Sequence, residues 1–124
     1  MHSHKGSLEG KHIALLGLGQ SQLDYHLSIT HSQEYDEIWA INAMCAVVQP
    51  DRVFMMDPAS RFLDTEDAGG QTKVMRKVLP TLQCPIYSCE LDPRVPSIEL
   101  YPLGQVVGEL IIDAGVIRDN RVYV

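Results

Sequence analysis

The sequence predicts an α/β fold: one domain in three layers, with a mostly parallel sheet in the middle. Short apolar stretches repeatedly end at a glycine, an asparagine or an aspartate, and a segment with helical or mixed spacing follows each of them. This alternation is typical of βαβ units, whose crossovers are right-handed. The chain has 124 residues, 45% of them hydrophobic, which suits a single core. We expect a flexible tail over residues 1–10 and one domain over residues 11–124.

The first βαβ unit begins with the apolar run at 11–16, which ends at Gly17. A strand of a parallel sheet is buried on both faces, so its sequence loses the apolar–polar alternation, and this run fits that pattern. Residues 17–21 form a tight turn. Ser21 is a suitable N-cap for a helix through about residue 33, with Leu23, Leu27 and Thr30 on one face.

Two further strands follow the same outline. Residues 36–41 form the second strand, which ends at Asn42, and residues 43–49 form a short helical stretch. Residues 52–56 form the third strand, which ends at Asp57. Three strands, each followed by a turn and a helical or mixed segment, favour a parallel sheet.

The second half is less regular. Residues 59–70 are rich in acids and glycine, which indicates an exposed loop after a short helical turn. An amphipathic helix is expected at 71–79 because apolar and basic residues alternate at helical spacing. The remaining expected elements are a fourth strand at 85–88, a fifth at 98–101, a helix at 103–113 interrupted by two glycines, and a C-terminal β-hairpin in which 116–117 pairs with 121–124.

Composition excludes several classes of protein. The 16 acidic residues outnumber the 10 basic ones, and a net charge of −6 disfavours binding to nucleic acid. No apolar run reaches the roughly 20 residues that cross a membrane, and the N-terminus lacks the apolar stretch of a signal peptide. Three cysteines without a CxxC pattern indicate reduced thiols. We expect a cytoplasmic protein.

The turn between the first strand and its helix is the strongest local signal. Gly17 and Gly19 allow a ligand to approach the main chain, and the amide groups of the following helix, with Gln20 and Ser21, can bind a phosphate. The alternative is a tight turn without a ligand, because Gln22 stands where a dinucleotide-binding motif has its third glycine. Asn42 occupies the position of the acid that binds the ribose of NAD, so an NAD site is not supported.

Asp57 and Asn42 end neighbouring strands in the sequence, at the edge where open α/β sheets bind ligands. Asp57 could bind Mg²⁺ beside a phosphate, because Mg²⁺ prefers one or two carboxylates plus ligand oxygens. Alternatively, Asp57 caps the next helix. Asn42 either binds the ligand or closes its own turn.

The residues GLGQS at 17–21, IWAIN at 38–42 and PDRVFMMD at 50–57 resemble Rossmann-like proteins of the DUF115 and MptE-like group. They are also similar to uncharacterised proteins of tailed phages. The resemblance covers about residues 11–60. It implies a phosphorylated nucleotide or nucleotide sugar close to Gly17, Gly19, Ser21, Asn42 and Asp57.

The leading hypothesis is therefore a cytoplasmic module that binds a nucleotide, nucleotide sugar or other phosphorylated small molecule, with a Mg²⁺-dependent transferase reaction as its enzymatic form. The alternative is a non-catalytic, phage-encoded interaction or scaffold protein, as a shortened form of a larger enzyme. Sheet edges and the apolar segment 103–112 predict a homo-oligomer, most simply a dimer.

Overall fold

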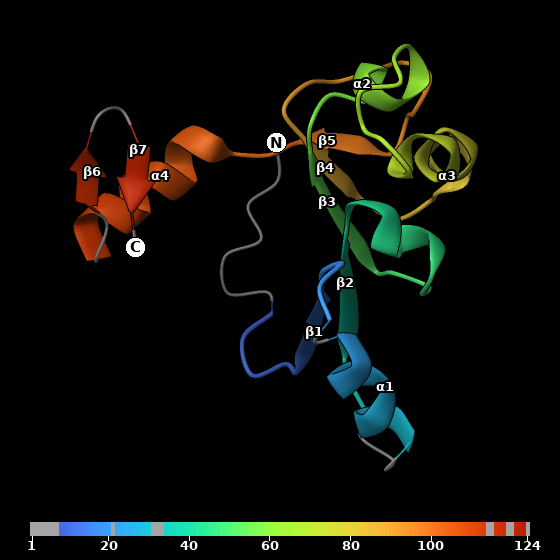
Figure 1. Ribbon diagram of the computed structural model, residues 1–124. Coiled ribbons are helices and arrows are strands. Elements are labelled where there is room, and N and C mark those ends of the chain that lie inside the picture. Colours follow the sequence, from blue (N-terminus) through green and yellow to red (C-terminus); the bar gives the residue numbers. More distant parts are fainter. Residues whose placement is uncertain (1–7, 21, 31–33, 114–115, 119–120, 124) are drawn as a thin grey trace.

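The structure is a computed structural model that describes residues 8–20, 22–30, 34–113, 116–118 and 121–123. Its centre is an all-parallel sheet of five strands in the order β1-β2-β3-β4-β5 (Figure 1). The strands are β1 (Ile13–Leu16), β2 (Glu37–Ile41), β3 (Arg52–Met56), β4 (Ile86–Ser88) and β5 (Ile98–Leu100). The predicted α/β class and parallel sheet are confirmed.

Helices connect most of the strands. They are α1 (Gln22–Thr30), the 3₁₀ helix η1 (Asn42–Ala46), α2 (Ser60–Leu63), α3 (Gln71–Val78), the 3₁₀ helix η2 (Leu79–Thr81) and α4 (Leu103–Asp113). After α4, β6 (Val116–Arg118) and β7 (Arg121–Tyr123) pair antiparallel. Residues 119–120, where we expected the hairpin loop, lie outside the described part of the chain.

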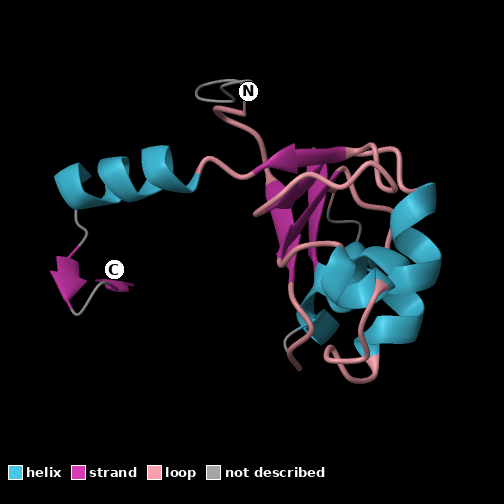
Figure 2. Ribbon diagram, turned by 90° about the horizontal axis from the view of Figure 1, so that it is seen from above, coloured by secondary structure: helices cyan, strands magenta, loops and turns pink. Residues whose placement is uncertain are grey.

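The consecutive strand order determines where the helices lie. Each right-handed crossover moves one strand further in the same direction, so successive connections pass over the same face of the sheet. Figure 2 shows α2 and α3 on one side of the sheet, while α4 extends away on the other side. The described sheet and its packed helices therefore form two layers, and the prediction of a third layer was wrong. Three layers need crossovers in both directions, whereas all crossovers between the described strands step in one direction.

The core lies between the sheet and this helical layer. Strands contribute alternate residues, and α2 and α3 add Phe62 and Met75, each at most 2% exposed. The buried hydrophobic cluster consists of Ala14, Leu16, Ala40, Met44, Cys45, Val53, Met55, Ala59, Phe62, Met75, Leu79, Ile86, Val95 and Ile98. Burial raises the pKa of the Cys45 thiol to about 11, so this cysteine is protonated and unreactive at neutral pH.

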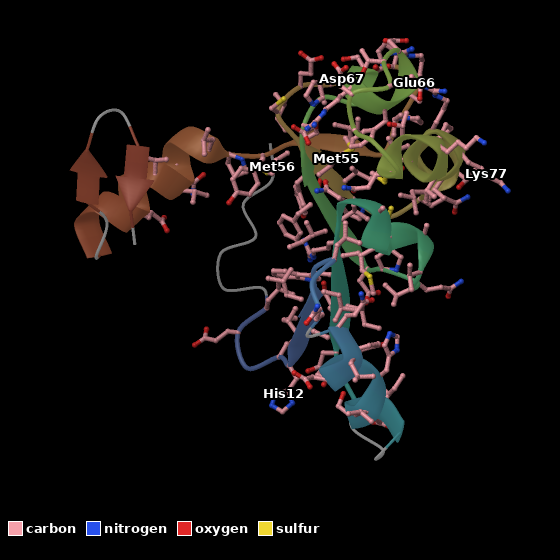
Figure 3. The ribbon with its side chains drawn as sticks, in the orientation of Figure 1. His12, Met55, Met56, Glu66, Asp67 and Lys77 are labelled. Carbon is pink, nitrogen blue, oxygen red and sulfur yellow. The ribbon has the colours of Figure 1, made fainter. Side chains whose placement is uncertain are left out.

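The other face of the sheet carries the alternate strand residues. We call it the open face and define it by Leu15, Trp39, Arg52, Phe54 and Tyr87. Leu15 is 58% exposed, whereas its neighbours along β1 are buried or nearly so. At the end of β3 the same change of side separates buried Met55 from exposed Met56 (Figure 3). In β1 and β3, buried residues therefore alternate with more exposed ones, although we expected the run at 11–16 to be buried on both faces. All three residues of β4 are buried.

One local prediction was wrong. The expected apolar stripe of α1 does not face the core, because Leu23 and Leu27 are 59% and 50% exposed. Tyr25 packs against the core instead, and the Ser28 hydroxyl lies 2.7 Å from the Tyr35 hydroxyl. The segment 59–70 has the expected form: it begins with the short helix α2, which carries a buried phenylalanine, and mostly exposed residues follow.

The connection from β4 to β5 has no helix, and Arg94 attaches it to the end of α2. Arg94 donates hydrogen bonds from Nη1 and Nη2 to the two carboxylate oxygens of Asp64, at 2.8 and 2.9 Å. It also binds Asp92, its neighbour in the loop. These hydrogen bonds lower the pKa of Asp64 and lower that of Asp92 to about 2. Arg94 therefore holds the loop against the end of α2.

We predict that Phe62→Ala lowers the free energy of unfolding by about 3–5 kcal/mol, because it leaves a cavity in the core. The control is Leu91→Ala, at a position that is 63% exposed, with an effect below about 0.5 kcal/mol. Urea unfolding measures both. Equal effects would contradict the assignment of Phe62 to the core.

We also predict a pH dependence from Arg94. Carboxylates with a lowered folded-state pKa stabilise the protein above their unfolded pKa of about 3.9, and this stabilisation disappears as the pH falls toward the folded value. The urea midpoint of Arg94→Gln should therefore fall less than that of the parent when the pH is lowered from about 5 to about 2. An unchanged fall in the variant would show that the two carboxylates do not depend on Arg94.

Candidate functional site

The predicted ligand-binding residues follow three adjacent strands. Residues 17–20 follow β1, Asn42 follows β2 and Asp57 follows β3. Because these strands are parallel neighbours, their ends lie at one edge of the sheet, which we call the carboxyl edge. The ends of β1 and β3 are about 10 Å apart, at two strand spacings. His12, by contrast, precedes β1 and lies at the other end of the sheet (Figure 3). Ser21 lies outside the described residues.

The glycine turn is open to solvent and has no steric need for glycine. A Cβ atom added to Gly17 or Gly19 would meet no atom within 4 Å, and neither residue has a positive φ. Gln20 is exposed, and its carbonyl accepts a hydrogen bond from Leu23 at 3.3 Å. Backbone conformation and packing therefore do not account for the two glycines, whereas free space above the main chain is what a bound ligand needs.

Asn42 has an unusual conformation at the end of β2. Its φ is +49°, in the left-handed region that asparagine adopts more readily than most residues. Its Oδ1 atom is buried and accepts no hydrogen bond from the described residues. The asparagine therefore makes the turn through its backbone, and its side-chain oxygen does not close that turn. A buried acceptor without a donor is costly, so this atom is suited to a donor from outside the described chain.

Asp57 has a guanidinium partner. Arg61 Nη1 donates a hydrogen bond to Asp57 Oδ2 at 3.0 Å. The capping alternative for Asp57 is not observed, because α2 begins at Ser60 and has no side-chain cap. The Asp57 carbonyl also accepts a hydrogen bond from the Ser88 hydroxyl at 2.5 Å, which attaches this strand end to β4.

These residues do not form a Mg²⁺ site by themselves. Among the described residues, no group of three or more histidine, cysteine, aspartate or glutamate side chains could hold a metal ion. The guanidinium of Arg61 already binds the carboxylate of Asp57, and a metal ion would have to displace it. Mg²⁺ binding at Asp57 therefore stays a prediction that depends on oxygens from a ligand.

Sequence reasoning missed a second group of residues, on the open face. The Glu37 carboxylate accepts hydrogen bonds from Arg52 Nε at 2.8 Å and from Trp39 Nε1 at 2.9 Å. Arg52 Nη1 donates to the Tyr87 hydroxyl at 2.7 Å. The hydrogen bond between Arg52 and Glu37 lowers the pKa of Glu37 and raises that of Arg52. Glu37 and Arg52 thus satisfy each other within the face. Glu99 pairs in register with Tyr87, and its buried Oε2 atom has no hydrogen-bond partner among the described residues.

Aromatic rings surround this network. Phe54 lies between Trp39 and Tyr87, with ring centroids 5.2 and 5.0 Å apart, and Tyr101 meets its edge at 6.5 Å. These residues line a shallow, largely apolar cavity of about 210 Å³, completed by Leu8, Arg52 and Pro102. Drug-sized ligands usually occupy about 300–1,000 Å³, so this cavity suits one side chain or a single ring.

The sequence does contain a signal for this face. Glu37 and Trp39 alternate with aliphatic residues in β2, and Arg52 and Phe54 do so in β3. We interpreted these runs only as strands of a parallel sheet. Period-two alternation instead indicates that the two sides of a strand have different surroundings.

Comparisons with known proteins add no assignment: no known protein family, no curated protein and no solved structure matches this chain. In the part of the chain that the structure describes, no helix has the length and apolar character needed to cross a membrane.

We predict that Tyr87→Phe lowers the free energy of unfolding by about 1–2 kcal/mol, because Arg52 loses a hydrogen-bond acceptor in a half-buried position. Tyr101→Phe is the matched control, since the Tyr101 hydroxyl has no hydrogen-bond partner among the described residues; its effect should stay below about 0.5 kcal/mol. Urea unfolding compares the two, and equal losses would show that the Arg52 hydrogen bond contributes nothing.

Proposed function

We propose that this domain binds a phosphorylated small molecule at its carboxyl edge. Two observations together carry the proposal. The fold does not require the glycines of the turn, and at the end of the adjacent strand the buried Oδ1 of Asn42 has no hydrogen-bond partner among the described residues. The turn leaves room for an anion against the main chain, and Oδ1 can accept a hydrogen bond from the rest of the ligand.

The proposal needs a positive charge, and Arg61 can supply it. Asp24 in the first turn of α1 would repel an anion at the nearby amide groups. Arg61 lies in α2, and its side chain, which is 42% exposed, pairs with Asp57 at the end of β3. Its guanidinium can exchange this carboxylate for phosphate, because both anions accept paired hydrogen bonds from arginine.

The finer parts of the proposal rest on the resemblance of residues 11–60 to Rossmann-like proteins. It supports a nucleotide or nucleotide sugar as the phosphorylated ligand and a transferase as the enzymatic form. The parallel strands and glycine turn agree with a Rossmann-like domain in outline. The consecutive strand order does not provide the reversal point at which such sheets form their ligand crevice, so the ligand would lie over the loops.

A thermal-shift series tests ligand binding, with inorganic pyrophosphate and nucleoside diphosphates as the probes. A ligand at 100 times its dissociation constant should stabilise the protein by about 2.7 kcal/mol. Gly19→Val should abolish the shift and preserve the fold, because its side chain fills only the space above the turn. Leu18→Val, in the same turn, is the control and should bind like the parent. If no phosphorylated probe stabilises the parent, the interaction or scaffold alternative is favoured.

Substitutions at Asp57 and Arg61 separate an arginine site from a metal site. Arg61→Gln should lose binding, while Lys77→Gln, which removes one positive charge from the outer side of α3 (Figure 3), should keep it. Asp57→Asn should strengthen binding, because Arg61 loses its competing carboxylate. If Asp57 instead binds Mg²⁺, Asp57→Asn should weaken binding and abolish its Mg²⁺ dependence, which would overturn the role of Arg61.

A further inference from the structure

We propose that the open face of the sheet binds helix α4 of a second copy of this chain, in a dimer that exchanges the two helices. This inference does not rest on the proposed ligand site. It begins from the sheet itself: a parallel sheet is normally covered on both faces, and the packed helices of this chain cover one. In the described part of the chain, the open face therefore lacks a helical layer.

The open face is suited to an apolar partner. Two of its charged groups, Glu37 and Arg52, are already paired with each other at 2.8 Å and are only 15% exposed. The Oε2 atom of a third, Glu99, is buried beneath the surface. What remains is a cavity of about 210 Å³ bordered by four aromatic rings, with exposed Leu15 on a neighbouring strand. A partner that fills this surface needs aliphatic side chains and no charge.

Helix α4 presents such side chains. Leu103 is 57% exposed, Val106 and Val107 are only partly buried, and the sequence continues the spacing with Leu110. The charged residues of the helix are confined to Glu109 and Asp113. Its apolar side therefore matches the chemistry that the open face requires.

The same chain does not bring α4 onto its own sheet. The Tyr101 amide donates to the Ser88 carbonyl, so the chain leaves β5 in line with the sheet, and Pro102 follows at once. From this point α4 extends away from the strands, as Figures 1 and 2 both show, and its main contact is with β6. The apolar helix and the bare face thus belong to one chain but lie apart.

The dimensions agree with an exchange. The eleven residues of α4 extend about 16 Å, and the five strands span about 19 Å. A helix of this length and of about 10 Å diameter buries on the order of 300 Å² on each side of its contact. Two exchanged helices then bury on the order of 1,200 Å², which is the lower limit for stable interfaces. The exchange would give a closed, two-fold dimer, the commonest kind of oligomer.

Sedimentation of the full chain at micromolar concentration tests the proposal, together with the fluorescence of Trp39, which is the single tryptophan and lines the open face. We expect a dimer, and on dilution the emission of Trp39 should shift to the red as the mass falls to one chain. Val106→Asp on the helix and Leu15→Glu on the face should each give a folded monomer with red-shifted emission.

Matched variants control for the added charge. Gln105→Asp, on the same helix, and Leu91→Glu, at an exposed loop position, should both remain dimeric. A parent that is monomeric at all micromolar concentrations overturns the proposal. If Val106→Asp nevertheless shifts the emission of such a monomer, α4 covers the sheet of its own chain. A dimer that survives Val106→Asp, or whose dissociation leaves Trp39 emission unchanged, also overturns it, because the interface then lies elsewhere.

Discussion

The handedness of the crossovers is the constraint on which the rest of this structure depends. Every connection between the five strands steps in the same direction, and right-handed connections then pass over the same face. From this follow the position of the core, the exposure of Leu15 and an aromatic face that no described helix covers. The order also removes the reversal point that creates a ligand crevice in doubly wound sheets, so any ligand at the carboxyl edge binds to loops and side chains.

Two surfaces with different chemistry result. The carboxyl edge combines a turn with two glycines, one buried acceptor that has no partner among the described residues, and one exchangeable arginine. The open face is largely apolar at its surface, and Glu37 and Arg52 are paired within it. The first surface suits a small anion and the second a protein segment. The two proposals can therefore fail independently.

Local features were predictable from the sequence, and long-range ones were not. Apolar runs that end at Gly17, Asn42 and Asp57 located three strands, because a strand end needs only local turn chemistry. Strand order depends on which strands pair, and residues far apart in the sequence decide that. The predicted third layer failed for this reason. In α1 the spacing of Leu23 and Leu27 was misleading, because Tyr25 occupies the inward position.

The candidate site shows the same division. The carboxyl-edge residues could be predicted because each ends a strand, while the pairing of Asp57 with Arg61 depends on the start of α2 and was missed. The network of Glu37, Arg52 and Tyr87 joins three strands, so no single stretch of sequence predicts it.

The position of β1 in the sheet tests the consecutive strand order directly. Nuclear Overhauser effects between backbone protons of neighbouring strands measure this position. The consecutive order predicts cross-strand contacts from Ala14 and Leu15 to β2, around Ile38 and Trp39, and none from β1 to β4. Contacts between β1 and Ile86 or Tyr87 would contradict it. They would place β1 in the interior of a reversed sheet, with helices on both faces and a crevice at the carboxyl edge.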